Sequence, residues 1–196
     1  MITRLQGIAD IQTGVFRKPD IQGEIIYFQV KHFDNEGRLI SPTLLSRELK
    51  NDDSLKNHLL KHKDILFAAK GPRNFASLYN HSIGPATAST TFFVIRLKNE
   101  AKIMILPEYI LWFLNHPHTT SFLKSNAKGG SIPSISKVTL SQLEIPIPDL
   151  QVQEKILQID QLRKKEKELT RKILQKKQEL YLALTYQAAN KEMKKD

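Results

Sequence analysis

The side chains best suited to metal chemistry in this chain are two pairs of histidines. His58 and His62 are one helical turn apart, and His116 and His118 flank Pro117. Two imidazoles can share a transition metal, but protein metal sites add cysteine or carboxylate ligands at matching spacing, and neither pair has them. We therefore expect surface histidines and no metal site.

Catalytic motifs are missing as well. The sequence has no glycine-rich phosphate or dinucleotide loop, no GxSxG, no HExxH, no Asn/Asp-Pro-Pro-aromatic segment for methylating an amino base, and no cysteine. A nuclease-like Glu-x-Lys occurs only as Glu192-Met193-Lys194, at the chain end. The sequence predicts a non-catalytic protein that binds no cofactor itself. A small enzyme would require a histidine or carboxylate site that these motifs do not describe.

The formal net charge of +10 is the extreme value of the composition, and both the first 150 residues and the remainder are basic. Such an excess favours a polyanionic partner, with an affinity that falls as salt rises. The alternative is a surface charge that only keeps the protein in solution.

The remaining composition indicates a globular protein with a core, since 40% of the residues are hydrophobic and 26% are charged. No apolar run approaches the roughly 20 residues of a membrane span, and Met1-Ile2-Thr3-Arg4 does not open a signal peptide. We expect a cytoplasmic location.

Runs of β-branched and aromatic residues predict four strands in the body of the chain, at 24–30, 64–69, 75–79 and 90–97. Two further segments predict helices. Residues 44–63 have helical character with a break near Asn51 and a cap at Ser54. A second helical pattern follows Pro107 and runs to Lys124, where Pro117 allows either one kinked helix or two short ones.

The character changes after Asp149, a plausible helix cap, because residues 150–190 contain neither glycine nor proline. One helix of this length would reach about 60 Å. Apolar residues follow an approximate 3-4 spacing, although Glu166 and Lys176 fall on the same seam. This seam predicts a weak coiled coil with one other helix. Its apolar members are Ile159, Leu162, Leu169, Ile173, Leu180 and Ala183.

The predicted fold is therefore α+β. A mixed globular domain at 1–148 precedes a long helix at 149–190, which pairs in a coiled coil, and a frayed tail at 191–196.

Several short segments, in order, resemble the specificity (S) subunit of bacterial type I restriction-modification systems. The match to the family's kGDIL strand has Lys63 where glycine is usual. The segments are Lys63-Asp64-Ile65-Leu66-Phe67, Lys70-Gly71-Pro72-Arg73, Phe93-Val94-Ile95-Arg96, Leu106-Pro107-Glu108-Tyr109-Ile110, Phe113-Leu114-Asn115, Gly129-Gly130-Ser131-Ile132-Pro133, Leu143-Glu144-Ile145-Pro146-Ile147-Pro148 and Leu150-x-x-Gln153-x-x-Ile156.

The resemblance implies a DNA-binding target recognition domain followed by a spacer helix, without chemistry of its own. It implies double-stranded DNA and methyltransferase (M) subunits as partners, with restriction (R) subunits as further ones. S-adenosylmethionine, ATP and Mg would be bound by those partner subunits alone.

The family normally has two recognition domains and two antiparallel helices, whereas this chain has one of each. A homodimer that reads an inverted repeat, or one half of a larger subunit, would explain the difference. The alternative function is an interaction scaffold whose basic helix docks a partner without DNA sequence selectivity.

The residue types suggest where such a domain would touch DNA. In the loop Lys70-Gly71-Pro72-Arg73-Asn74, arginine can pair with guanine and asparagine with adenine, although the loop can equally be a strand connection. The glycines of Lys128-Gly129-Gly130-Ser131 allow close approach to phosphate, or simply make a flexible linker. Further candidates for contact with DNA are Lys31, His32, Arg38, Thr87, Ser89 and Thr91.

Overall fold

The computed structural model describes residues 1–20, 23–41, 45–127 and 133–192, without the side chains of 191 and 192. The chain divides into two compact units, 1–154 and 155–196. The first unit is mixed α+β, as the sequence predicts, and the second is the continuation of one long helix.

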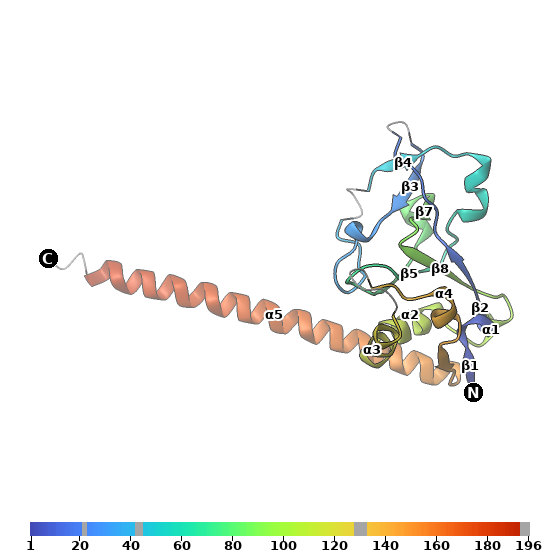
Figure 1. The fold of residues 1–196 in the computed structure, drawn as a ribbon. Coiled ribbons are helices and arrows are strands. Elements are labelled where there is room, and N and C mark those ends of the chain that lie inside the picture. Colours follow the sequence, from blue (N-terminus) through green and yellow to red (C-terminus); the bar gives the residue numbers. More distant parts are fainter. Residues whose placement is uncertain (21–22, 42–44, 128–132, 193–196) are drawn as a thin grey trace. The chain divides into compact units, whose positions relative to one another are not determined.

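Two sheets form the body of the first unit (Figure 1). The larger is antiparallel, with the order β2-β8-β5-β6. The smaller has the order β4-β3-β7, in which β3 pairs antiparallel with β4 and parallel with β7. The strands are β2 (Ala9–Thr13), β3 (Ile25–Phe28), β4 (Arg47–Leu49), β5 (Ile65–Ala68), β6 (Ala76–Leu78), β7 (Ala86–Ala88) and β8 (Phe92–Leu97).

The central strands are buried on both faces because apolar layers cover both sides. Every residue of the central strands β3 and β5 is buried, which explains their continuous apolar sequences. Side chains of β3 and β7 share one core with side chains of β5 and β8. Phe28, Phe33, Phe75 and Phe92 are almost fully buried in this core, and their neighbouring ring centroids lie 5.5–6.1 Å apart.

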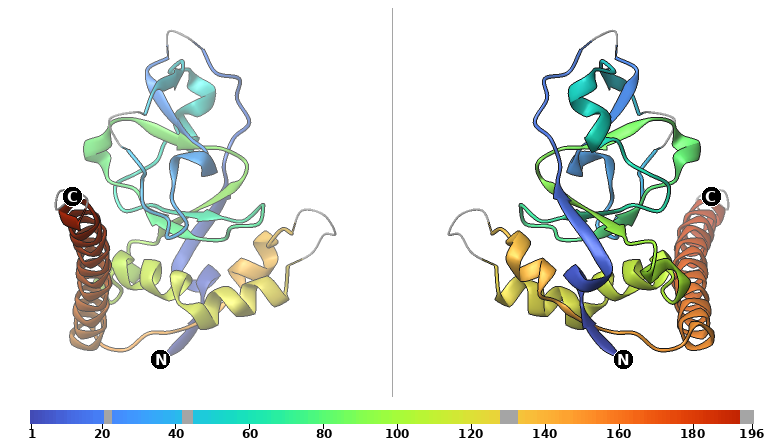
Figure 2. Two further views of the ribbon diagram at one scale, coloured as in Figure 1. Left: turned by 90° about the vertical axis from the view of Figure 1, so that its left-hand side faces the viewer. Right: turned by 90° about the vertical axis from the view of Figure 1, so that its right-hand side faces the viewer.

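Short helices gather at the end of unit 1 opposite β3 and β4 (Figure 2). They are α1 (Leu5–Ile8), α2 (Pro107–Asn115), α3 (Pro117–Ser125) and α4 (Lys137–Ser141). Pro107 and Pro117 each occupy a first-turn position, and His116 between the helices is extended. Of the two possibilities left open, two short helices is correct.

The expected helix between residues 44 and 63 is wrong. Its first part, as far as it lies among the described residues, contains strand β4, and its second part is a 3₁₀ helix, η3 (Asp53–His58). The cap is Asp52, whose carboxylate accepts the Leu55 N–H at 3.1 Å, while Ser54 donates its hydroxyl to Asp52. Pairing with β3 and burial of Leu49 and Leu55 outweigh the weak helical pattern.

Strand β1 (Ile2–Arg4) pairs with β9 (Glu144–Pro146) and joins the two ends of unit 1. The last helix, α5 (Leu150–Glu192), begins where the sequence predicts, since the Asp149 carboxylate accepts the Val152 N–H at 2.9 Å. Its first turn belongs to unit 1.

In unit 2, pairs on one helix surface add local support, namely Lys172 with Glu168 and Lys176 with Glu179. No helix among the described residues is long and apolar enough to cross a membrane.

Candidate nucleic-acid interface

The topology brings the ends of several strands to one region of unit 1. Strands β3 and β7 are parallel, so the segments that follow both of them leave the sheet at the same end. Strand β8 runs antiparallel to β5, so its start lies beside the end of β5. We call these segments, 30–40, 69–74, 89–91 and the neighbouring 133–135, the loop cluster.

Arg73 holds two of these loops together. Its Nη1 donates to the Phe33 carbonyl at 3.4 Å and to Asn35 Oδ1 at 3.0 Å, and its Nη2 donates to the Val30 carbonyl at 3.4 Å. Asn74 closes its own loop, because Nδ2 donates to the Ala68 carbonyl at 2.9 Å. Both predicted base readers therefore make bonds within the domain.

Lys70 lies where the 69–74 loop meets the segment 133–135. Lys70 and Ser134 form an isolated β-bridge, the Gly71 N–H donates to the Pro133 carbonyl at 3.1 Å, and the Ile135 N–H donates to the Ala69 carbonyl at 2.9 Å. The Lys70 side chain is exposed. Four of the predicted contact residues, Lys128, Gly129, Gly130 and Ser131, lie outside the described residues, shortly before this bridge.

The turn after β3 presents three more candidates. Lys31 is exposed, and Arg38 is exposed while its guanidinium contacts the Glu36 carboxylate at 2.6 Å. His32 is half-buried, and its Nδ1 accepts the Gln29 N–H at 3.2 Å. Burial and the nearby charge of Lys31 lower the pKa of His32, against a smaller opposing effect of Glu48. The neutral imidazole is thus part of this turn.

The hydroxyl side chains between β7 and β8 are less accessible than the sequence suggests. Ser89 is buried and shares a hydrogen bond of 2.6 Å with the half-buried Thr91, whose carbonyl accepts the Ala69 N–H. Thr87 is fully buried and donates to the His58 carbonyl at 2.9 Å. Thr87 therefore packs inside the domain and does not face a ligand.

Sequence reasoning missed three residues of the quoted motifs that position the helices. Tyr109 donates its hydroxyl to the Pro146 carbonyl at 2.7 Å, and burial raises the pKa of that hydroxyl. The Asn115 amide exchanges two hydrogen bonds with the backbone of Ala76, at 2.8 and 2.9 Å. These contacts fix α2 against β9 and β6.

Gln153 is the third such residue and is completely buried. Its Nε2 donates to the Met104 and Pro148 carbonyls, both at 2.8 Å, and its Oε1 accepts the Leu106 N–H at 3.0 Å. This amide fixes the first turn of α5 within unit 1. Nothing in the local sequence marks this glutamine as buried, because its partners are backbone atoms distant along the chain or in the preceding turn.

The histidines noted in the sequence do not form one cluster. His58 Nδ1 bonds Gln12 at 2.6 Å, whereas His62 faces His81 with a separation of 3.0 Å between their Nδ1 atoms. His116 and His118 stack on each other. Within the described part of the chain, no three metal-ligating side chains come together.

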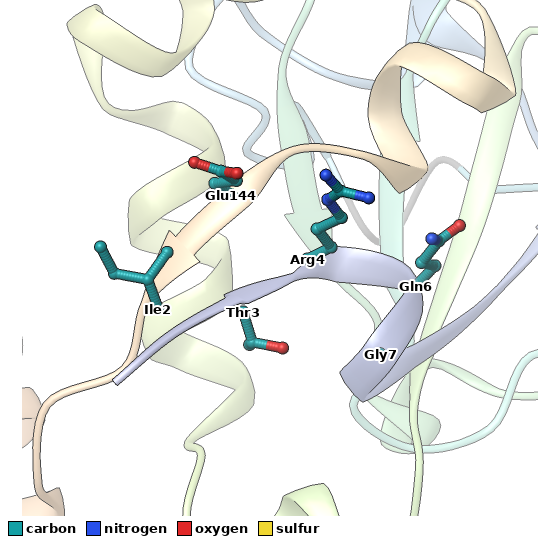
Figure 3. Close-up of a pocket in the computed structure, with 6 residues that line it drawn as sticks. All are labelled: Ile2, Thr3, Arg4, Gln6, Gly7 and Glu144. Carbon is teal, nitrogen blue, oxygen red and sulfur yellow. The ribbon is translucent and has the colours of Figure 1, made fainter.

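A shallow depression lies outside the loop cluster, on β1, α1 and β9 (Figure 3). Ile2, Thr3, Arg4, Gln6, Gly7 and Glu144 line it. The lining holds neither a cysteine nor a histidine, so it lacks the usual pairing of a nucleophile with an imidazole base.

Comparisons with known proteins agree with the resemblance read from the sequence. Residues 3–179 match the family model of the type I restriction modification DNA specificity domain. The chain is 31% identical over 133 residues to the type I restriction enzyme HindI specificity subunit of Haemophilus influenzae. The aligned region covers 65% of this chain and 28% of that subunit.

Solved structures share the fold. The HsdS subunit from Thermoanaerobacter tengcongensis aligns with a TM-score of 0.61 and 17% identity over 87% of this chain and 39% of its own. A chain from a study of assembly and conformational transition of a type I R-M system aligns with a TM-score of 0.63 and 18% identity, over 87% of this chain and 40% of that one.

This chain belongs to the family of type I restriction-modification DNA specificity domains. Specificity subunits are the non-catalytic part of such systems, which agrees with the non-catalytic protein that the sequence predicts. It spans well under half the length of the relatives that it matches.

Proposed function

We propose that the chain recognises specific DNA sequences through the loop cluster and directs bound methyltransferase subunits to them. The observation that carries this proposal is that one end of the strands gathers nearly all of the described candidate residues in a domain of the specificity family. Exposed lysine and arginine side chains and backbone turns lie together there. Phosphate contacts use such cationic side chains together with backbone N–H groups.

The exposed cations Lys31, Arg38 and Lys70 are suited to phosphate. Arg73 and Asn74 shape the loops in the DNA-free protein, and base reading by Arg73 would require its three bonds to the 30–35 turn to be exchanged for guanine. Ile40 is 65% exposed beside His32 and is suited to a thymine methyl group. The segment 128–131 remains a predicted phosphate contact.

Two copies of the chain would supply the two recognition domains of a bipartite target. A symmetric pair reads an inverted repeat with a fixed spacer. The exposed apolar seam of α5 supports this pairing, because Ile159, Leu162 and Leu180 are each 59–67% exposed in the single chain.

Apolar residues outside that seam support a further protein partner. Leu174, Tyr181 and Leu182 are 55–63% exposed and lie on other faces of the helix. A two-helix pair would leave them uncovered, so a methyltransferase subunit is the proposed occupant. Restriction subunits would join through it, with S-adenosylmethionine, ATP and Mg bound to these partners.

The test is to mix the purified chain with the methyltransferase subunit of its own system and S-adenosylmethionine, and to map methylated bases on genomic DNA. The proposal predicts one enriched bipartite motif, only when both proteins are present. Methylation without sequence preference, or no methylation with a complex that nevertheless forms, would favour the scaffold alternative.

A further inference from the structure

The two charged residues that interrupt the apolar seam of α5 are placed symmetrically about Arg171. Glu166 lies five residues before Arg171 and Lys176 five residues after it. Both fall on the 3-4 repeat that includes Leu162, Leu169, Ile173 and Leu180, and the helix is continuous through this region. Opposite charges at equal distances from one centre are self-complementary under a two-fold axis.

The spacer helices of the family pair antiparallel, and the homodimer of the proposed function would pair two copies of α5 in the same way. We infer that this pair is centred at the level of Arg171, and that Glu166 and Lys176 fix this register. The inference rests on the homodimer of the proposed function and adds the register of its helices. In this register Glu166 of each copy faces the partner's Lys176, so two opposite-charge pairs form in the seam.

The apolar residues fall into matching layers in the same register. Leu169 faces the partner's Ile173, Leu162 faces the partner's Leu180, and Ile159 faces the partner's Ala183. All five large side chains are between 48% and 67% exposed in the single chain, so each has surface to bury. In every layer an a position of one helix faces a d position of the other, which is the geometry of an antiparallel coiled coil.

Other arrangements of the same two helices leave the seam charges worse placed. In a parallel pair at equal height, Glu166 would face the partner's Glu166 and Lys176 the partner's Lys176. A shift of one heptad in the antiparallel pair puts Lys176 or Glu166 opposite an apolar side chain. A buried charge without a partner is costly, so these alternatives are disfavoured.

Within one chain Lys176 contacts Glu179 at 2.7 Å, and both side chains remain substantially exposed. Such a surface pair is weak and leaves Lys176 free to turn toward a partner helix.

The proposed register also fixes how far apart the two copies of unit 2 begin. The first residues of unit 2 in the two copies would lie about 48 Å apart along the helix axis, at 1.5 Å per residue.

Charge reversal tests the register directly. In sedimentation experiments over about 1 to 100 µM protein, Glu166→Lys and Lys176→Glu should each weaken dimerisation at least about tenfold, because each creates two like-charge pairs. The double variant should recover to within about threefold of the unmodified chain. Arg171→Glu is the matched control, since it makes the same charge change as Lys176→Glu outside the seam and should have little effect.

Cysteine crosslinking separates the register from dimerisation itself, because the natural chain has no cysteine. A Leu162→Cys chain mixed with a Leu180→Cys chain should join through a short thiol crosslinker. Leu162→Cys mixed with Ile173→Cys should not, because these positions are displaced by one heptad, about 10 Å.

The register would be wrong if the chain dimerises but is crosslinked at other pairs, or if dimerisation is insensitive to the charge reversals. Either result would leave the homodimer intact. A chain that stays monomeric would overturn the self-pairing together with the homodimer, without touching DNA recognition by the loop cluster.

Discussion

Asp64 and Arg96 form a bidentate ion pair where β5 begins and β8 ends. Arg96 Nε donates to Asp64 Oδ1 at 2.8 Å and Nη2 donates to Oδ2 at 2.6 Å, and Nη2 also donates to the Leu59 carbonyl at 3.1 Å. Asp64 is 1% exposed and further accepts the Lys61 N–H at 2.7 Å. Its hydrogen bonds raise the pKa of Arg96. The aspartate and arginine of two quoted family motifs thus meet in the folded domain.

Replacing Asp64 with alanine should lower the free energy of unfolding by about 3 kcal/mol, because the arginine and the Lys61 N–H lose a buried acceptor. Chemical denaturation measures this loss. Lys56→Ala, which removes an exposed ion pair with Asp53, is the control and should cost less than about 1 kcal/mol. Equal losses for both variants would contradict the structural importance of the Asp64–Arg96 pair.

The backbone at Lys63, the residue before Asp64, explains why glycine is usual at this position in the family. Lys63 has a φ of 67°, a left-handed conformation that glycine adopts without strain and lysine does not. Lys63→Gly should therefore be more stable to denaturant than Lys63→Ala by about 1 kcal/mol. Both variants lose the Lys63–Glu108 contact, so their difference reports the backbone alone. Equal stabilities would show that the left-handed conformation carries no strain.

His32 should make stability depend on pH. Its pKa is lowered in the folded protein, so the unfolded chain binds a proton more readily as the pH falls below about 6.5. Stability is therefore full above this value and decreases as the pH falls toward the lower pKa of the folded state. Comparing denaturation midpoints at several pH values, His32→Gln should flatten this decrease.

His118→Gln, at an exposed position of α3, should retain the decrease of the unmodified protein. A His32→Gln curve parallel to that of the unmodified chain would contradict a role for the neutral imidazole in the turn after β3.

The loop cluster can be tested through the salt dependence of DNA binding. The double change Lys31→Ala and Lys70→Ala should weaken binding and reduce the slope of log affinity against log salt by about 1.8, if each lysine neutralises one phosphate. Titrations of a fluorescent duplex at several salt concentrations measure the slope.

The matched control removes two lysines at the opposite end of β8, Lys98 and Lys102. That variant should keep the slope of the unmodified protein. If both variants change the slope equally, the charge acts through the whole domain and the loop cluster is not the contact surface.

Much of the fold follows from local sequence, and the exceptions depend on distant contacts. The strands expected near 24–30, 64–69, 75–79 and 90–97 are confirmed, because runs of β-branched and aromatic residues favour strands wherever they pair. The pairing of β1 with β9 joins residues at least 140 positions apart and has no local signal. The error at β4 has the same cause, since its pairing with β3 decides a segment with weak preferences of its own.

The candidate site shows a similar division. From residue type alone, Arg73 is predicted to read a base. In the folded domain its guanidinium instead donates to three acceptors in another loop. Asn115 and Gln153 carry no signal in one sequence, because their partners are backbone atoms distant along the chain. That the candidate segments lie together could be known only once the strand order was known.

The central claim is that this domain reads DNA sequence, and selection of bound duplexes from a random pool tests it most directly. The experiment is best made at about 150 mM salt, where non-specific phosphate binding is weak, with and without the methyltransferase subunit. The account predicts an enriched inverted repeat with a constant gap. A pool that stays random with the methyltransferase present would contradict it.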